Sequence, residues 1–171
     1  LHKARVDLTA IAELVLSTMK PLIGEKDIKL TAEISPEVHY LNADEFRLQQ
    51  VLFNLMGNAA KYTKQGYIKL SAFVSNDDLV IEISDSGVGI PDEMRQSLFR
   101  PFEQVHVEGH HRASGTGLGL SISRQLVELH GGLLELDSQV EKGTTVSLIF
   151  PRDMIATTNE KQEIVKVDPP A

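Results

Sequence analysis

The stretch QVLFNLMGNAAKYT, residues 50–63, has the pattern of a long helix that is only partly apolar. At about 100° per residue, one stripe of this helix is apolar and comprises Leu48, Val51, Leu52, Leu55 and Ala59. A second band, about 110° away, comprises Arg47, Gln50, Asn54, Asn58 and Lys61. Asparagine is a mediocre helix former and costs free energy when it is buried without a partner. The two asparagines therefore lie either on a solvated polar face or along a pocket over a sheet.

The segments on either side of this helix predict further helices and strands. Apolar residues recur with helical spacing from Leu8 to Met19, and Pro21 with Gly24 is expected to end that helix. Asp44 is the expected N-cap of the long helix, which should end near Lys61. Shorter helices are expected over 92–98 and 118–130, and strands over 28–34, 38–41, 67–74, 79–85, 133–139 and 144–150.

This order of elements predicts an α+β fold. The last four strands form two hairpins, and helices separate them from the earlier strands, so we expect a two-layer α/β sandwich. Its sheet should be mixed and mainly antiparallel, with the helices on one face; a doubly wound sheet fits the order less well. Residues 1–152 are expected to form one domain. Residues 153–171, which are mixed in charge and poor in aromatics, are expected to be a linker or disordered tail.

Composition narrows the classes of function. The 171 residues carry a formal net charge of −7 at pH 7, which argues against a broad electrostatic footprint for nucleic acid or an anionic membrane. There is no cysteine, which excludes thiolate metal sites and fits a reducing compartment. No apolar run approaches the length of a membrane span. We therefore expect a cytoplasmic, non-inserted piece, and the lack of an initial methionine indicates that it is cut from a longer protein.

Two glycine-rich stretches could bind a nucleotide. In DSGVGI, residues 85–90, a carboxylate at a strand end is followed by Gly87 and Gly89, so Asp85 could accept a hydrogen bond from an adenine amino group. In GTGLGL, residues 115–120, glycines at a helix N-terminus could free backbone N–H groups for phosphate. Alone, the first could equally be an ordinary turn and the second a loop closure. Together with the asparagine band they are complementary parts of one nucleotide site.

At this point the sequence resembles the GHKL superfamily, and specifically the catalytic ATP-binding domain of two-component sensor histidine kinases. NLMGNAAKYT (54–63) is similar to the N box, DSGVGI to the first glycine box, LFRPFEQ (98–104) to the F box and GTGLGL to the second glycine box. The order and spacing of the four motifs also match, over roughly residues 5–150. The resemblance implies a Bergerat-type ATP-binding fold, in which Mg-ATP lies between the long helix and a lid formed by residues 103–116.

The resemblance also implies roles for individual residues. Asn58 would ligate Mg²⁺, Asn54 would line the phosphate site, Lys61 would contact phosphate, and these three would carry catalysis. Tyr62 would pack on the nucleotide, and Asp85 would accept from the adenine amino group. Further nucleotide contacts would come from the glycine boxes and the lid, namely Gly87, Gly89, Ile90, Arg112, Gly115, Thr116, Gly117, Leu118, Gly119 and Leu120. For Arg112, ordinary solvation is an equal alternative.

Asn54 bears on the type of reaction. In the water-splitting members of the superfamily, the gyrase, Hsp90 and MutL group, a glutamate four residues before the metal-binding asparagine activates water. Asn54 occupies that position here and cannot take up a proton at neutral pH. Transfer of the phosphoryl group to a protein acceptor is therefore favoured over hydrolysis, because such transfer needs mainly positioning and charge neutralisation from the ATP side.

The phosphate acceptor is not recognisable in this chain, since His2 followed by Lys3 does not match a histidine followed by an acidic residue. We expect it on an adjoining dimerisation domain of a homodimeric parent, with or without a membrane anchor, and a response regulator or receiver domain as the further partner. The rival functions are an inactive ATP-sensing module and a protein-serine kinase of the anti-sigma-factor type. A zinc site at His106, His110 and His111 is disfavoured by their loose spacing. Phe99 and Phe102 are expected either in the core or against the histidine-bearing domain.

Overall fold

The computed structural model describes residues 1–100 and 119–157. Its α-helices are α1 (Leu8–Ile23), α2 (Glu45–Tyr62) and α3 (Gly119–Leu129). Its strands are β1 (Ala4–Asp7), β2 (Ile28–Ile34), β3 (Tyr40–Ala43), β4 (Gly66–Ser75), β5 (Asp78–Asp85), β6 (Leu133–Gln139) and β7 (Gly143–Pro151). Short 3₁₀ turns are η1 (Pro36–Val38), η2 (Asp92–Met94), η3 (Ser97–Phe99) and η4 (Arg152–Met154).

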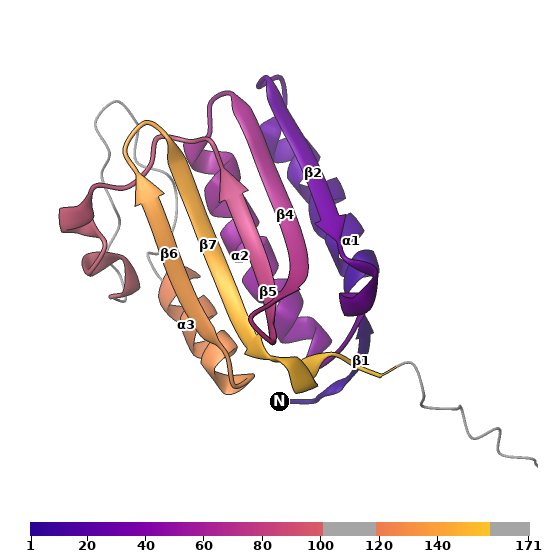
Figure 1. Ribbon diagram of the computed structural model, residues 1–171. Helices are drawn as coiled ribbons and strands as arrows, with labels where there is room; N and C mark the ends of the chain where they lie inside the picture. The colour runs from indigo at the N-terminus through magenta and orange to yellow at the C-terminus, as the bar shows by residue number, and fades with distance from the viewer. Residues whose placement is uncertain (101–118, 158–171) are drawn as a thin grey trace, which may run out of the picture.

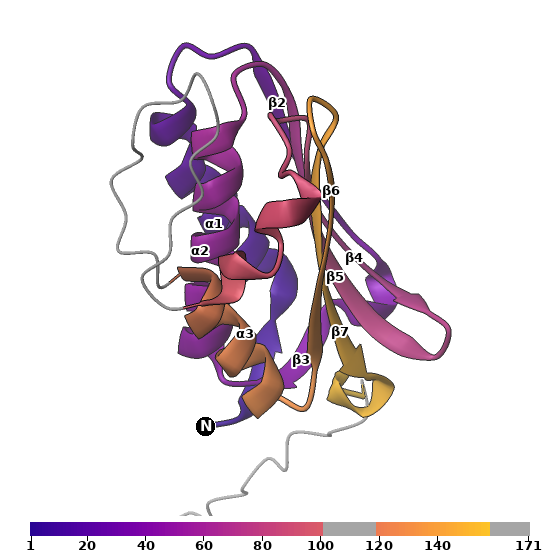
Figure 2. The ribbon, with the colours of Figure 1, turned by 90° about the vertical axis from the view of Figure 1, so that its left-hand side faces the viewer.

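The main sheet has five strands in the order β2-β4-β5-β7-β6 (Figure 1). Only β2 and β4 are parallel, and the other neighbours are antiparallel. A separate two-stranded sheet pairs β1 with β3. The three α-helices all cover one face of the main sheet, and among the described residues no α-helix lies on the other face (Figure 2). This arrangement confirms the predicted two-layer α/β sandwich with a mixed, mainly antiparallel sheet.

The core lies between the helices and the covered face of the sheet. The apolar stripe predicted for α2 is buried throughout, and Met56 and Ala60 join it. On the sheet side, alternate residues of β4, β5 and β7 fill the same layer, among them Ile68, Ile81 and Leu148, each with no exposed surface. Burial of one face of an amphipathic helix against alternating strand residues explains why these patterns specify this packing.

A buried histidine joins α2 to α3 at the end of the molecule away from the motifs. The backbone N–H of Asp44, the N-cap of α2, donates to Nε2 of His130 at 3.1 Å. Nδ1 of the same ring lies 2.7 Å from the carbonyl of Leu126, to which it donates. His130 is buried, so both ring nitrogens find the partners that a buried polar group requires.

The structure corrects several expected boundaries. Helix α1 continues through Pro21 to Ile23, because Ile23 is buried in the core and Gly24, with φ +57°, supplies the turn that ends the helix. The strand expected over 38–41 is found at 40–43, since Pro36 opens a 3₁₀ turn before it. The helix expected over 92–98 is instead the two turns η2 and η3. Strand β1 was not expected.

The chain stays attached to the domain for a few residues beyond Arg152. Met154 is buried, Ile155 forms an isolated antiparallel bridge with Leu41, and the N–H of Ala156 donates to the Tyr40 carbonyl at 2.9 Å. The expected linker or tail over 153–171 therefore begins with residues that contact the fold, and residues 158–171 lie outside the described part of the chain.

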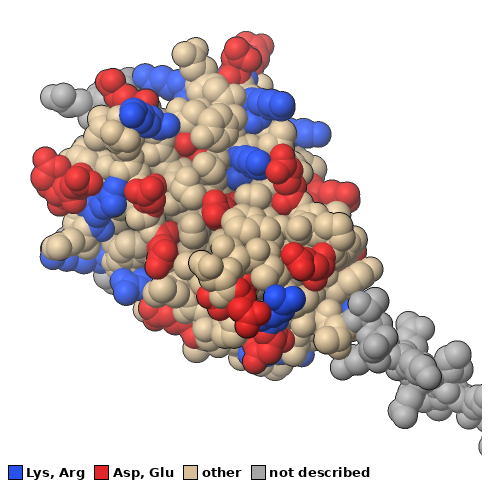
Figure 3. Space-filling model, in the orientation of Figure 1, with Lys and Arg blue, Asp and Glu red and all other residues tan. Residues whose placement is uncertain are grey.

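Within the described residues, no helix has the length and apolar character that crossing a membrane requires. The face of the sheet opposite to α1, α2 and α3 shows acidic and basic side chains interspersed with uncharged ones (Figure 3).

Candidate functional site

Helix α2 presents the predicted polar band beside its buried stripe. Asp44 caps the helix by accepting from the N–H of Arg47 at 3.1 Å. Further along, Asn54 and Asn58 are half-buried, while Lys61 in the last turn is exposed. Partial burial at the margin of the core is compatible with a pocket wall, so the two asparagines stay candidates for the site.

Asn54 also makes a contact that the sequence did not reveal. Its Nδ2 donates to Oγ of Ser123 on α3 at 3.5 Å, the outer limit for a hydrogen bond. Ser123 has no exposed surface. The serine hydroxyl, carried by the helix that follows the second glycine box, therefore helps to orient the Asn54 amide.

Asp85 is the last residue of β5, and its carboxylate points to the backbone of the first glycine box. The N–H of Gly87 donates to Oδ1 of Asp85 at 2.8 Å. Burial raises the pKa of Asp85 above its ordinary value, and hydrogen bonds from the backbone of Gly87 and Thr144 oppose this shift only in part. A half-buried carboxylate held by backbone amides is a fixed acceptor, as recognition of an adenine amino group requires.

The last turn of α2 and the first glycine box are in direct contact. The N–H of Val88 donates to the carbonyl of Tyr62 at 3.2 Å. A Cβ atom on Gly87 would lie 2.5 Å from that same Tyr62 carbonyl oxygen and 2.9 Å from Oδ1 of Asp85. Glycine is required at position 87 because of this close approach. The structure thus brings Tyr62 and Asp85, predicted from separate motifs, to one place.

Tyr62 is half-buried at this junction, and burial raises the pKa of its hydroxyl. The neighbouring Thr63 has no exposed surface, and its Oγ1 has no hydrogen-bond partner among the described residues. Sequence reasoning did not single out Thr63.

The second half of the first glycine box rests on the turn between β6 and β7. The N–H of Ile90 donates to Oγ of Ser138 at 2.8 Å, and the N–H of Glu141 donates to the carbonyl of Val88 at 2.7 Å. Gly89 has φ +71° and packs directly on the backbone of Gln139, so a side chain there would be both strained and obstructed.

Ser138 is a supporting residue that the motifs did not indicate. It is buried, and its hydroxyl also donates to the carbonyl of Gly143 at 3.0 Å and lies 2.7 Å from Oγ1 of Thr144. Thr144 is paired in register with Asp85 across β7 and β5. The β6–β7 hairpin therefore supports the Asp85 end of the site from the opposite side to α2.

The second glycine box and the lid are described only in part. Gly119 begins α3, and Leu120 is half-buried against the core. Phe99, in η3, packs against the core. The guanidinium carbon of Arg124 lies over the Phe99 ring, 5.1 Å from the ring centroid. The remaining predicted contacts, Arg112, Gly115, Thr116, Gly117 and Leu118, lie outside the described residues, as do Phe102, His106, His110, His111 and the whole predicted lid over 103–116.

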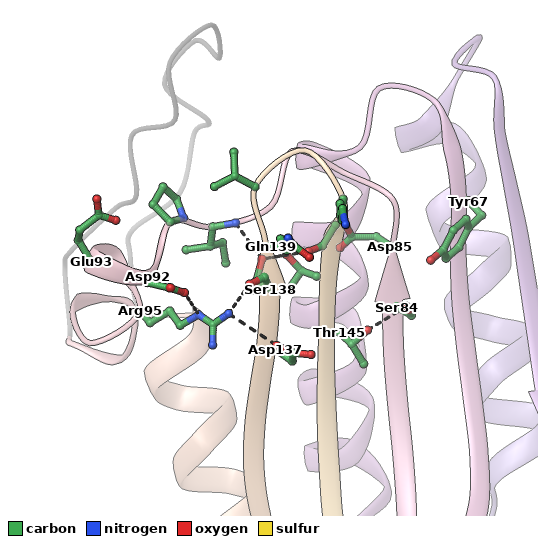
Figure 4. Close-up of a pocket in the computed structure, with 16 residues that line it drawn as sticks. Tyr67, Ser84, Asp85, Asp92, Glu93, Arg95, Asp137, Ser138, Gln139 and Thr145 are labelled. Carbon is green, nitrogen blue, oxygen red and sulfur yellow. Dashed lines mark hydrogen bonds and ion pairs between the residues drawn. The ribbon is translucent and has the colours of Figure 1, made fainter.

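A cavity of about 890 Å³ opens at the same end of the sheet (Figure 4). Asp85 and Ile90 are among its lining residues, together with Ser84 and Thr145, whose hydroxyls lie 3.0 Å apart. Arg95 closes one side, where it pairs with Asp92 at 3.3 Å and Asp137 at 3.6 Å and donates to the carbonyl of Ser138.

None of the predicted residues of α2 is among the described residues that line this cavity. The cavity therefore coincides with the candidate site only at Asp85 and its loop. The candidate site is better defined by the contact between that loop and the last turn of α2, because Tyr62 and the Asp85 carboxylate meet there, and Asn58 lies one helical turn before Tyr62.

Comparison with known proteins agrees with this geometry. The family described as histidine kinase-, DNA gyrase B-, and HSP90-like ATPases matches residues 43–154. The chain is 36% identical over 151 residues to the circadian input-output histidine kinase CikA of Synechococcus elongatus, covering 86% of this chain and 20% of CikA. It is 38% identical over 145 residues to the sensor histidine kinase AruS of Pseudomonas aeruginosa, covering 81% of this chain and 14% of AruS. The chain thus spans a fifth or less of these two relatives.

Solved structures resemble it as well. The catalytic domain of histidine kinase ThkA, in a nucleotide-free form, superposes with a TM-score of 0.75 at 27% identity, covering 89% of this chain and 99% of that one. Full-length ShkA, in complex with AMPPNP, superposes with a TM-score of 0.77 at 30% identity, covering 88% of this chain and 31% of ShkA. The chain therefore belongs to the family of histidine kinase-, DNA gyrase B- and HSP90-like ATPases, as a catalytic ATP-binding domain of the sensor histidine kinase type.

Proposed function

We propose that this domain binds Mg-ATP and transfers the γ-phosphoryl group to a histidine on an adjoining dimerisation and phosphoacceptor domain. The observation that carries the proposal is the contact between the last turn of α2 and the Asp85 loop, through Val88 and Tyr62. This contact supports the proposal because Asp85, which would read the base, lies beside the end of a helix whose polar band would offer amide and ammonium groups to phosphate. The structure of ShkA, which resembles this chain at 30% identity and is in complex with AMPPNP, supports nucleotide binding in the proposal.

The donor set fits a magnesium ion held together with phosphates. Mg²⁺ keeps several waters and needs only one or two protein oxygens besides phosphate, and the half-buried amide of Asn58 offers one such oxygen. When bound, Mg²⁺ supplies neutralisation of the phosphate charge. In this proposal Asn58 holds the ion, and Asn54 and Lys61 line the phosphates. Asp85 accepts from the adenine amino group, and Tyr62 packs against the nucleotide.

Asn54 favours phosphoryl transfer over hydrolysis. Its amide donates to Ser123 and has no basic atom that could take a proton from water at neutral pH. In the proposed reaction, a nitrogen of the acceptor imidazole forms the new bond to the γ-phosphorus. The bond from that phosphorus to the β–γ bridging oxygen breaks, and ADP leaves. The imidazole proton passes to a base of the acceptor domain or to solvent.

The partners and setting of the parent protein follow from the same proposal. They are its own phosphoacceptor domain, present in a homodimer, and a cognate response regulator or receiver domain. The domain works on the cytoplasmic side, whether or not the parent has a membrane anchor. CikA and AruS, which are both histidine kinases by name, are consistent with this assignment.

A transfer assay tests the function. The chain is incubated with γ-labelled Mg-ATP, first alone and then with a separately produced domain that carries an acceptor histidine. We expect no label on the chain itself and label on the added domain that is lost in acid and stable in alkali. ATP binding without transfer to any supplied histidine domain would instead indicate the sensing module. Acid-stable label on a protein substrate would indicate the serine kinase.

A further inference from the structure

A lysine outside the motifs holds the end of α2. Lys26, in the connection between α1 and β2, donates from Nζ to the carbonyl of Ala60 at 2.8 Å and to the carbonyl of Thr63 at 3.1 Å. It lies outside residues 43–154, the range that the family matches. The signature of the family therefore does not account for this contact.

Of the two carbonyls that Lys26 binds, that of Ala60 belongs to the last turn of α2 and that of Thr63 to the residue that caps the helix. The last four carbonyls of an α-helix have no partner within the helix and must find one elsewhere. The N–H of Val88 donates a hydrogen bond to the carbonyl of Tyr62. The ammonium of Lys26 donates to the carbonyls of Ala60 and Thr63. A positive charge at this position also interacts favourably with the negative end of the helix dipole.

The backbone that carries Lys26 is held in place by hydrogen bonds. The N–H of Lys26 donates to the carbonyl of Ile23 at 3.2 Å, and its own carbonyl accepts from the N–H of Ile28 at 2.9 Å. The N–H of Gly66 donates to the carbonyl of Asp27 at 2.9 Å, which joins this connection to the start of β4. Figure 2 shows the connections that follow α1 and α2 at the same end of the molecule.

The turn that Lys26 holds is the one that carries the phosphate-side residues. Ala60 lies between Asn58 and Lys61, so movement of its carbonyl moves both side chains. We propose that Lys26 is a positioning residue that fixes the phosphate end of the nucleotide site through the last turn of α2. This inference rests on the proposed function, because it assigns Asn58 and Lys61 to Mg-ATP.

The first test compares affinities for two nucleotides. Lys26→Met is expected to weaken Mg-ATP binding by about tenfold, since small displacements of positioning groups have large effects. Binding of AMP, which lacks the β- and γ-phosphates, should change by less than about twofold, because Asp85 is held from the other side by the β6–β7 hairpin. Lys26→Arg, which retains a charged donor, should restore most of the affinity. Lys29→Met, at an exposed lysine on β2, is the matched control and should bind like the wild type.

The second test does not need a nucleotide. The amide of Thr63, bonded to the carbonyl of Ala59 at 3.1 Å, should exchange its hydrogen faster in Lys26→Met, while the amide of Leu48 at the other end of α2 should not. Unchanged Mg-ATP affinity, an equal loss for Mg-ATP and AMP, or unchanged exchange at Thr63 would each overturn the inference. If the wild-type chain binds no Mg-ATP, the proposed function fails, and exchange at Thr63 still decides whether Lys26 holds α2.

Discussion

Replacement of Gly87 by alanine should separate the two halves of the nucleotide site. The added methyl group would lie 2.5 Å from the Tyr62 carbonyl oxygen, 2.9 Å from Oδ1 of Asp85 and 3.0 Å from Oγ1 of Thr63. The closest of these atoms is backbone and cannot rotate away. The loop and the end of α2 must therefore move apart by at least about 0.5 Å to reach even a tight contact. That movement acts directly on the bond between Val88 and Tyr62.

The magnitude follows from two contributions. Overpacking at a closely packed position costs about 1–3 kcal/mol. Loss of the Val88–Tyr62 hydrogen bond adds about 1 kcal/mol. Gly87→Ala should therefore lower the free energy of unfolding by about 2–4 kcal/mol, and ATP affinity should fall by about a hundredfold because the base and phosphate ends are displaced from one another.

The free energy of unfolding is measured by urea denaturation followed by circular dichroism, since the chain has no tryptophan for fluorescence. The ATP affinity is measured by calorimetric titration with Mg-ATP. Gly57→Ala in α2 is the matched control, because a Cβ there meets no described atom within 4 Å. That variant should raise the free energy of unfolding by about 0.5–1 kcal/mol through helix propensity. If Gly87→Ala unfolds within about 0.5 kcal/mol of the wild type and binds Mg-ATP equally well, the close contact at Gly87 does not hold the two parts of the site together.

Two further substitutions test individual groups of the site. Burial raises the pKa of Asp85, so the folded state holds this proton to higher pH than the unfolded state does, and stability falls as pH rises from the unfolded pKa through the folded pKa. Asp85→Asn should remove this loss of stability at higher pH. It should also remove the gain in ATP affinity that the wild type is expected to show as pH rises through the same range. If the pH profiles of the free energy of unfolding and of ATP affinity are both unchanged in Asp85→Asn, this expectation is wrong. Thr63→Val replaces a buried hydroxyl that has no partner among the described residues, at an extended backbone position that suits valine. It should therefore raise the free energy of unfolding by about 1 kcal/mol, whereas a loss of similar size by urea denaturation would show that the hydroxyl is satisfied.

The elements that the sequence predicted well are those with a strong local signal. Helix α2 has an apolar stripe of five residues, an N-cap and a clear end, so its bounds and its buried face could both be predicted. The hairpin of β4 and β5 was equally clear, because Asn76 and Asp77 favour the left-handed conformation that the turn adopts, with φ of 50° and 64°. Asp85 could be placed at a strand end for the same reason.

The features that were missed depend on contacts between distant segments. Strand β1 has four residues and exists because β3 pairs with it, which no local pattern indicates. Ser123 and Ser138 support Asn54 and Ile90 through hydroxyls, and a serine in a helix or strand carries no periodic signal. In the sequence, nothing distinguishes Lys26 from the other lysines, and only the fold shows that it contacts the end of α2. Pro21 does not end α1, because the burial of Ile23 retains the last turn of the helix.

Calorimetric titration of the wild type and of Asn58→Ala with ATP, with and without Mg²⁺, shows whether Asn58 holds the metal. We expect the wild type to bind ATP and Mg²⁺ to tighten this binding. Asn58→Ala should retain metal-free binding through Asp85 but lose the tightening by Mg²⁺. If Mg²⁺ tightens binding equally in the two proteins, Asn58 does not hold the metal at the end of α2, and the proposed nucleotide site is wrong.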